Sequence, residues 1–238
     1  MNNNKKTPNL IIPPELEGKT FLDPKYDTAF KLLFQEKELL IHFLNGVLHL
    51  NEQDKIKDID YRAQENILGF TDAVTTVRFD LMAKTEKDEF IHIEIQKARH
   101  TFWKDRVLLY NAALMLQAKK DFHFHKSIYK LPKIISVWVC DFKQGEGSHF
   151  HEEWSLYRRS DLVKGGNAVP VTDLLSYIFL ELPSFNKSLS ELKSIEDKWL
   201  YLLNTAGDSV HSPVTDDVRI ARAYAKLRVD RQSQEILL

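Results

Sequence analysis

The stretch FIHIEIQ, residues 90–96, has the alternating pattern of a β-strand at the centre of a sheet. Its three isoleucines fall on one face of an extended chain. The other face carries Phe90 and three polar residues, His92, Glu94 and Gln96. Burying a charge is costly unless a nearby group compensates it. Glu94, with Gln96 beside it, is therefore the first candidate for a functional residue.

A second strand with the same alternation, VRFDLMAK at 77–84, precedes this one and carries Asp80 on its polar face. The five residues TEKDE between the two strands suit a hairpin loop. A symmetric hairpin pairs Lys84 with Phe90 and places Asp80 opposite Glu94. Facing carboxylates are unfavourable unless a positive charge lies between them, and Mg²⁺, or Mn²⁺ in its place, is the simplest candidate. The alternative is that both acids line the solvent face of an edge hairpin.

Helices and further strands flank this hairpin. The predicted helices cover residues 24–49, with a break near 35–37, then 102–120, 186–204 and 216–230. The predicted strands outside the hairpin cover residues 56–68 and 133–142, with one or two more after residue 143. This order predicts an α/β fold in which a mixed β-sheet is flanked by helices.

Composition and length favour one sizeable globular core. The chain has 238 residues, of which 43% are hydrophobic and 28% charged, and it has no run of about 18 apolar residues that would span a membrane. Residues 1–20 lack the apolar stretch of a signal peptide, so we expect an exposed, flexible leader and a cytoplasmic protein. The core is expected over residues 21–180, with a helical C-terminal extension over 181–238.

Basic residues gather in one part of the chain. The net charge is −1, but residues 97–133 hold nine Lys/Arg and two Asp, a net of +7, which leaves −8 for the remainder. This region is a candidate for binding the phosphates of DNA. The residues expected to do so are Lys97, Arg99, Lys104, Lys119 and Lys120. The alternative is a solvated helix with its flanking loops.

Five segments in this order resemble a known family. They are FLDPKYDTAFKLLFQEKELLIHFLN (21–45), RFDLMAK (78–84), IHIEIQ (91–96), WKDRVLLYNAALML (103–116) and LPKIISVWVCDF (131–142). Together they resemble the Rpn family of recombination-promoting nucleases, the transposase-like branch of the PD-(D/E)XK fold, over about residues 21–204. The resemblance implies a restriction-endonuclease-like core and a metal-dependent DNA endonuclease linked to recombination or mobile elements.

The resemblance also implies roles for individual residues. Asp80 and Glu94 would bind Mg²⁺, and the backbone carbonyl of Ile95 would be a further ligand. Gln96 occupies the position of the usual lysine, a departure that removes a positive charge from that position. Asp27 resembles an acid that some members place on the first helix near the metal; the alternative is a first-turn acid favoured by the helix dipole.

Arg106 and Tyr110 match an arginine and a tyrosine common in this branch, and they lie one helical turn apart. We expect Arg106 near the metal or the scissile phosphate, with Tyr110 supporting it. The alternative is a surface arginine that packs over an aromatic ring. Lys97 follows Gln96 directly and points to the opposite face, so it is a weak substitute for the missing lysine.

Other motifs suggest rival sites. Two His-x-His pairs, His123 with His125 and His149 with His151, could bind zinc together with Glu152 or Glu153, but both pairs fall in predicted loops. Surface or packing histidines are the alternative. Cys140, the only cysteine, lies in an apolar strand and is expected to be buried. Gly165-Gly166 lacks the context of a phosphate loop and is expected to form a turn.

A second function class stays open on sequence alone. The chain could be a DNA-binding or partner-binding module that keeps the nuclease fold without activity. Gln96 and the near-neutral charge favour this class, whereas the presence of both Asp80 and Glu94 favours an enzyme. A homodimer is expected only from the need to cut two DNA strands.

Overall fold

The structure, a computed structural model, describes residues 12–62, 65–69, 74–121, 129–147, 149–163 and 168–237. Residues 1–11 of the expected leader lie outside this part. The remainder of the expected leader contains a single short 3₁₀ turn, Pro14–Leu16.

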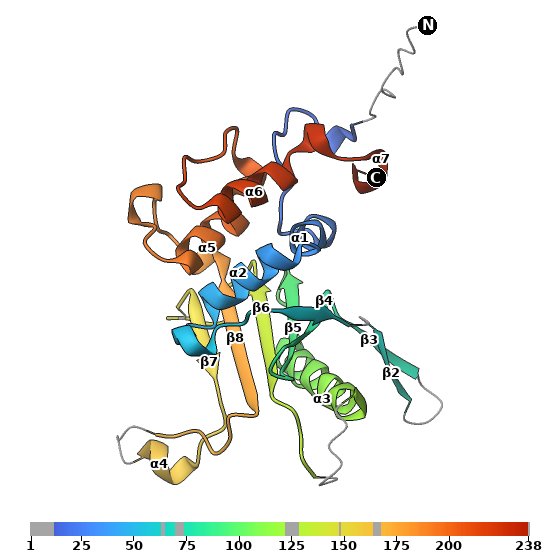
Figure 1. Cartoon of the computed structure of the whole chain (residues 1–238), viewed down its shortest axis with the longest axis vertical. Helices are drawn as coiled ribbons and strands as arrows, with labels where there is room; N and C mark the ends of the chain where they lie inside the picture. The colour runs from blue at the N-terminus through green and yellow to red at the C-terminus, as the bar shows by residue number, and fades with distance from the viewer. Residues whose placement is uncertain are drawn as a thin grey trace, which may run out of the picture.

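The centre of the fold is a six-stranded mixed sheet with strand order β1-β4-β5-β6-β8-β7. Its strands are β1 (Ile59–Tyr61), β4 (Leu81–Thr85), β5 (Phe90–Gln96), β6 (Ile134–Cys140), β8 (Leu175–Glu181) and β7 (His151–Trp154). β5, β6 and β8 run parallel, and the strands outside them pair antiparallel. β2 (Glu65–Gly69) and β3 (Val74–Arg78) form a separate two-stranded sheet near α3 (Figure 1).

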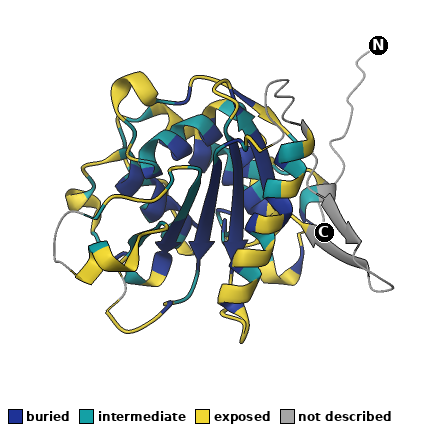
Figure 2. Ribbon diagram, turned by 90° about the horizontal axis from the view of Figure 1, so that it is seen from below, coloured by how far each residue is buried: buried dark blue, intermediate teal, exposed yellow. Residues whose placement is uncertain are grey.

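Helices cover both faces of the sheet. α1 (Asp27–Phe34), α2 (Lys37–Val47), α5 (Ile195–Thr205) and α6 (Val218–Leu227) gather on one side, and α3 (Trp103–Asp121) lies on the other (Figure 1). Of two short helices, α4 (Arg159–Val163) has no buried residue, whereas α7 (Gln234–Leu237) contributes Leu237 to the large hydrophobic core. The central strands are buried between the layers, whose outer faces are exposed (Figure 2).

The alternation in the central strand decides which layer each residue meets. Ile91, Ile93 and Ile95 belong to the large hydrophobic core shared with α1, α2, α5 and α6. Phe90 packs instead with Met82 and residues of α3. Both faces of β5 are therefore covered. The neighbouring strand β6 is also buried throughout, as its continuous apolar sequence predicts.

The predicted hairpin is confirmed in register and corrected in extent. Lys84 pairs with Phe90 and Leu81 with Ile93, as the symmetric loop requires. The expected strand over 77–84 is wrong, however, because the chain breaks between β3 and β4 at Phe79 and Asp80. Phe79 turns to the α3 side of the sheet, where it packs with Met82 and Phe90. Leu81, which alternation would place on the same face as Phe79, belongs to the core on the other side. The expected strand over 56–68 is likewise two elements, β1 and β2, in different sheets.

The helices follow their sequence signals with shifted starts. The break expected near 35–37 separates α1 from α2. α1 begins at Asp27, not at Pro24, because the Asp23 carboxylate accepts a hydrogen bond from the Lys25 N–H and holds a turn there. α5 begins at Ile195, nine residues after the expected start, where Ser194 caps it.

Candidate active site

The candidate site lies where β4 leaves β5. The last pair of this ladder joins Leu81 to Ile93, and β5 continues beyond it to Gln96. The main-chain N–H of Ile95 therefore extends past the end of β4, and the carboxylate of Asp80 accepts its hydrogen bond at 2.8 Å. In return the N–H of Asp80 donates to Oε1 of Glu94 at 3.0 Å. At the break in the predicted strand, Glu94 thus accepts a main-chain hydrogen bond from Asp80, and Asp80 accepts one from Ile95, the residue after Glu94.

Glu94 is fully buried, which excludes the alternative that both acids line a solvent face. Its second oxygen, Oε2, is buried and has no hydrogen-bond partner among the described residues. The guanidinium Nη2 of Arg106 lies 3.9 Å from that oxygen. Burial, and after it the charge of Asp80, raises the pKa of Glu94 well above its ordinary value. A cation next to Oε2 would stabilise the ionised form.

Asp80 is mostly buried and has a perturbed pKa as well. Burial raises the pKa of its carboxyl to about 6, the hydrogen bond from Ile95 opposes this shift, and the nearby charge of Asp27 adds to it. Two neighbouring acids whose pKa values are raised by burial and by the charge of a nearby carboxylate are typical of functional sites, because the surroundings leave them short of positive charge.

The first helix brings an acid and a base to this pair. Asp27, the first residue of α1, shares a hydrogen bond with Asp80. One turn later Lys31 forms an ion pair with Asp27, with Nζ 2.9 Å from Oδ2. The charge of Lys31 lowers the pKa of both Asp80 and Glu94, so it faces the whole acidic group. Sequence reasoning missed Lys31; the only signal for it was its i, i+4 spacing from Asp27.

Arg106 and Tyr110 approach the acids from α3. The guanidinium of Arg106 donates a hydrogen bond of 2.9 Å to the Tyr110 hydroxyl and lies 4.8 Å from the centre of that ring. The Tyr110 ring packs edge-on against Phe79, the residue that turned away at the strand break. Arg106 thus combines both expected arrangements, since it packs over an aromatic ring and also reaches toward Glu94.

Gln96 and Lys97 lie on opposite sides of the end of β5. Gln96 is buried on the same side as Glu94, and its carbonyl accepts a hydrogen bond from the Asp141 N–H at 2.9 Å. Lys97 turns toward α1, where its Nζ lies 3.3 Å from the centre of the Tyr26 ring. The position expected for the family lysine therefore carries no charge, while Lys97 is held by Tyr26.

A buried polar chain supports Glu94 from beneath. Nδ1 of His92 lies 4.0 Å from Oε1 of Glu94, and its Nε2 contacts the Ser136 hydroxyl. Trp138 donates a hydrogen bond of 2.7 Å from Nε1 to the same hydroxyl. Burial lowers the pKa of His92 to about 3, so its ring is neutral near pH 7. The sequence placed His92 on the correct face but indicated no role for it.

The basic residues expected to bind phosphate divide into two groups. Lys97, Arg99 and Lys104 lie between the end of β5, which carries Glu94, and the first turn of α3. Lys119 and Lys120 lie at the other end of α3, about 20 Å away at 1.5 Å per residue. Lys119 donates to the carbonyl of Lys130 at 2.8 Å.

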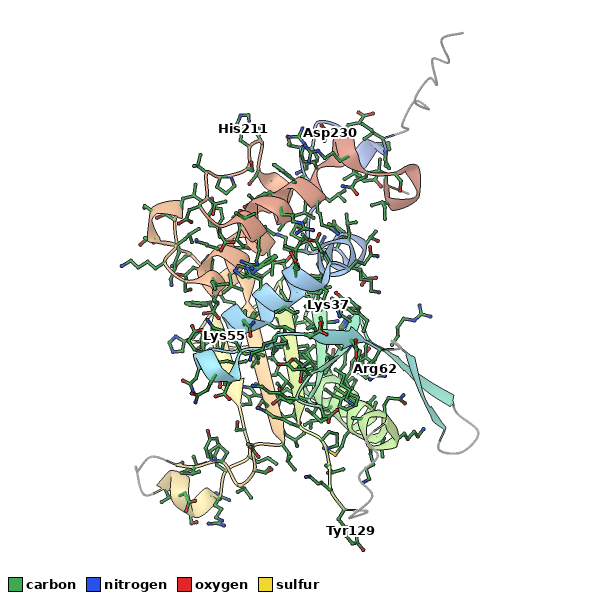
Figure 3. The ribbon with its side chains drawn as sticks, viewed as in Figure 1. Lys37, Lys55, Arg62, Tyr129, His211 and Asp230 are labelled. Carbon is green, nitrogen blue, oxygen red and sulfur yellow. The ribbon has the colours of Figure 1, made fainter. Side chains whose placement is uncertain are left out.

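Figure 3 shows Tyr129, the neighbour of Lys130 in the chain, at the opposite end of the molecule from His211 and Asp230. Lys119 contacts that distant end through the Lys130 carbonyl. The structure therefore does not bring Lys119 and Lys120 to the acidic group.

The rival motifs have mixed outcomes. His123, His125 and Gly165-Gly166 lie outside the described residues. His149 is exposed, and its N–H donates to Glu152, whereas His151 contacts His49 and Glu196, so the expected His149–His151 pair does not converge. Cys140 is buried, as expected, and burial raises the pKa of its thiol well above the ordinary value.

The described helices include none with the length and apolar character needed to cross a bilayer. Searches among curated proteins and among solved structures found no match. A family model described as PD-(D/E)XK nuclease family transposase matches residues 24–237. The mixed six-stranded sheet with helices on both faces is the restriction-endonuclease-like α/β architecture that the resemblance predicted. The chain therefore belongs to the PD-(D/E)XK nuclease family transposases.

Proposed function

We propose that this chain is a metal-dependent endodeoxyribonuclease that hydrolyses DNA phosphodiester bonds by direct attack of water. The observation that carries the proposal is the buried Oε2 of Glu94, the acid beside Asp80, which has no hydrogen-bond partner among the described residues while main-chain N–H groups hold both carboxylates. The guanidinium Nη2 of Arg106 lies 3.9 Å from that oxygen, which is too far for a hydrogen bond. An oxygen that is fixed, buried and without a hydrogen bond is suited to a bound cation.

The donors near Asp80 fit Mg²⁺. Its preferred ligands are oxygens, commonly one or two carboxylates completed by water and substrate phosphate. In an extended strand the N–H and C=O of a residue point to the same side, so the Ile95 carbonyl is expected to face Asp80, to which its N–H donates. Asp80, Glu94 and the Ile95 carbonyl would then hold the ion. When bound, Mg²⁺ or Mn²⁺ would acidify a water and stabilise charge on the phosphate.

The chain's own residues would supply the remaining charge. We propose that Lys31, on α1, provides the positive charge that Gln96 lacks, because Lys31 acts electrostatically on both Asp80 and Glu94. The Gln96 amide can orient a water through its hydrogen bonds but supplies no charge. Asp27 would keep Lys31 directed toward the acids through their ion pair.

DNA would approach along the start of α3. Arg106 presents a guanidinium held by Tyr110, and a planar guanidinium suits a phosphate oxygen. Lys97, Arg99 and Lys104 would follow the backbone phosphates on either side. A homodimer, a role in recombination or mobile elements, and a cytoplasmic location are further parts of the proposal.

The test is nicking of supercoiled plasmid by pure protein in Mg²⁺ or Mn²⁺. We expect cleavage by the wild type, loss of cleavage on chelation, and loss in Asp80→Asn and Glu94→Gln. Asp88→Asn is the matched control: it removes an exposed carboxylate from the same hairpin, at a φ of 63° that asparagine accepts readily. Cleavage that survives both site substitutions would contradict the proposal.

A second candidate function is a DNA-binding module without activity, and the neutral Gln96 favours it. Tight, salt-sensitive DNA binding with no cleavage in either metal would support this module. The presence of both acids favours the enzyme, because a module has no use for two carboxylates whose pKa values burial has raised.

A further inference from the structure

A second polar cluster lies on the same side of the sheet as α2 and α5, at the edge strand β7. It joins His49, which follows α2, His151 and Glu153 on β7, and Glu196 at the start of α5. His151 and His49 stack with ring centres 4.7 Å apart. One ligand atom from each of His49, His151 and Glu153 lies within 4.8 Å of the others, and among the described residues no further group of three or more His, Cys, Asp or Glu meets this limit.

Glu196 binds both imidazoles through one nitrogen each. Its Oε1 lies 2.5 Å from Nδ1 of His151, and its Oε2 lies 3.0 Å from Nε2 of His49. A carboxylate that accepts one ring N–H leaves the other ring nitrogen as a lone-pair donor, the usual arrangement behind metal-binding histidines. Nε2 of His151 and Nδ1 of His49 are then the available donors.

The spacing of the remaining donors suits a small ion. Nε2 of His151 is 3.3 Å from Oε1 of Glu153. Two ligand atoms on a tetrahedral centre with bonds of about 2.0 Å are themselves about 3.3 Å apart. His49 and Glu153 are more than half exposed, so an ion and a water can reach the cluster, whereas Glu196 is buried and keeps its position.

The backbone is shaped to bring these residues together. Gly46 lets α2 approach the start of α5, because a Cβ there would lie 2.7 Å from Cγ2 of Ile195 and 3.2 Å from the Glu196 nitrogen. His49 has a φ of 47°, in the left-handed region that non-glycine residues rarely adopt. These features place His49 over Glu196, next to a strand about one hundred residues further along the chain.

We infer that His49, His151 and Glu153 bind one divalent transition-metal ion, with Zn²⁺ the best fit, and that Glu196 orients both imidazoles. Two imidazoles and a carboxylate, with room for a water, form a donor set typical of zinc and unsuited to Mg²⁺, which prefers oxygen ligands alone. The ion would fasten the edge strand β7 to α2 and α5. This inference does not depend on the nuclease proposal.

The alternative is an ion pair without metal. Burial lowers the pKa of His151, but its hydrogen bonds to Glu153 and Glu196 raise it to about 9, so the metal-free ring is charged at neutral pH. In that case the cluster would hold a proton and no ion. The two possibilities differ in whether zinc binds with one-to-one stoichiometry.

The experiment titrates Zn²⁺ into the chelator-treated, tag-free 238-residue protein. Calorimetry measures binding, and the melting temperature is compared with and without the ion. An Asp80→Asn/Glu94→Gln background removes the candidate active site, so binding reports the histidine cluster whether or not the chain is a nuclease. We expect one Zn²⁺ per chain, a higher melting temperature, and no comparable effect of Mg²⁺. Co²⁺ in place of Zn²⁺ should give the visible absorption of a four-coordinate ion.

The variants are chosen so that the fold survives. His49→Ala and Glu153→Gln change exposed side chains and should each abolish binding, while His149→Ala, an exposed histidine two residues from His151, should leave it intact. Glu196→Gln should weaken binding by about 10- to 100-fold. Absence of stoichiometric zinc binding would overturn the inference, as would binding that His49→Ala and Glu153→Gln do not change.

Discussion

Asp80 and Glu94 are joined by a hydrogen bond of 3.0 Å from the main-chain N–H of the first to the carboxylate of the second. The Asp80 carboxylate in turn accepts a hydrogen bond from the main-chain N–H of Ile95, the residue after Glu94. The acids are thus positioned before any ligand arrives, although this places two negative charges together in a buried environment. Both the positioning and the repulsion have effects that can be measured.

Asp80→Asn should remove activity and stabilise the metal-free protein. The folded pKa of Asp80 is raised to about 6 from 3.8, so its contribution to stability is present below pH 4 and is lost as pH rises through 6. The amide is neutral and can still accept the Ile95 hydrogen bond. At pH 7.5 without metal we expect a gain of about 1–3 kcal/mol in the free energy of unfolding, measured by urea denaturation. A loss of stability would contradict the destabilising effect assigned to the Asp80 charge.

His92 should make the protein sensitive to acid. Burial lowers its folded pKa to about 3 from 6.5, so the unfolded state binds more protons and stability is lost as pH falls from 6.5 toward 3. His92→Gln keeps a polar contact to Ser136 without titrating and should flatten the pH dependence of unfolding. The measurement belongs in the Asp80→Asn background, where the opposite effect of Asp80 is absent. His149→Gln, at an exposed position, should leave the dependence unchanged.

Lys31→Met should slow DNA cleavage by about 100-fold, the usual effect of removing one group that stabilises transition-state charge. Lys31→Arg should restore part of the rate, because the charge returns with a different shape. DNA affinity should change little in either variant. The control is Lys37→Met, which removes a lysine on α2 that forms an ion pair with Asp58. A Lys31→Met enzyme with wild-type turnover would exclude a catalytic role for Lys31.

Salt dependence should separate the two basic groups. Replacing Lys97, Arg99 and Lys104 by alanine should weaken DNA binding and reduce the slope of log affinity against log salt by about 0.9 for each phosphate that is no longer neutralised. The double substitution of Lys119 and Lys120, at the far end of α3, should leave the slope nearly unchanged. Fluorescence anisotropy across a salt series measures both. An equal effect of the two sets would show that DNA runs along the whole helix.

Gly46→Ala should loosen the contact between α2 and α5. The added methyl group would lie 2.7 Å from the Ile195 side chain, so we expect a loss of about 1–3 kcal/mol in stability and weaker zinc binding. Gly145→Ala is the control, because nothing lies within 4 Å of the Cβ it would add. Thermal unfolding and zinc titration of both variants provide the comparison. Equal behaviour of the two would show that Gly46 does not help to form the cluster.

Local sequence patterns predicted the hairpin register and the central strand correctly, because period-2 alternation and loop length act over a few residues. They missed the break at Phe79 and Asp80, since alternation assigns Phe79 and Leu81 to one face. The structure puts them on opposite faces of the sheet. That break depends on where β3 pairs, in a separate two-stranded sheet, and no pattern within 77–84 contains this information.

The candidate functional residues that sequence reasoning missed all depend on tertiary placement. Lys31 reaches the acids only because α1 covers the end of β5, and its spacing from Asp27 is equally typical of an ordinary helix ion pair. His49 and His151 meet only because the fold brings the segment after α2 to the edge strand β7. The His-x-His spacing led to the wrong partner, since His149 is exposed and does not join His151.

The loop between β4 and β5 sets the distance along the chain from Asp80 to Glu94. Because side chains alternate along a strand, deleting or inserting one residue there would slide β4 by one position and rotate each of its side chains to the other layer. Asp80 would then no longer meet the N–H of Ile95. Lineages of this protein should therefore tolerate changes of residue type in this loop more readily than changes of its length.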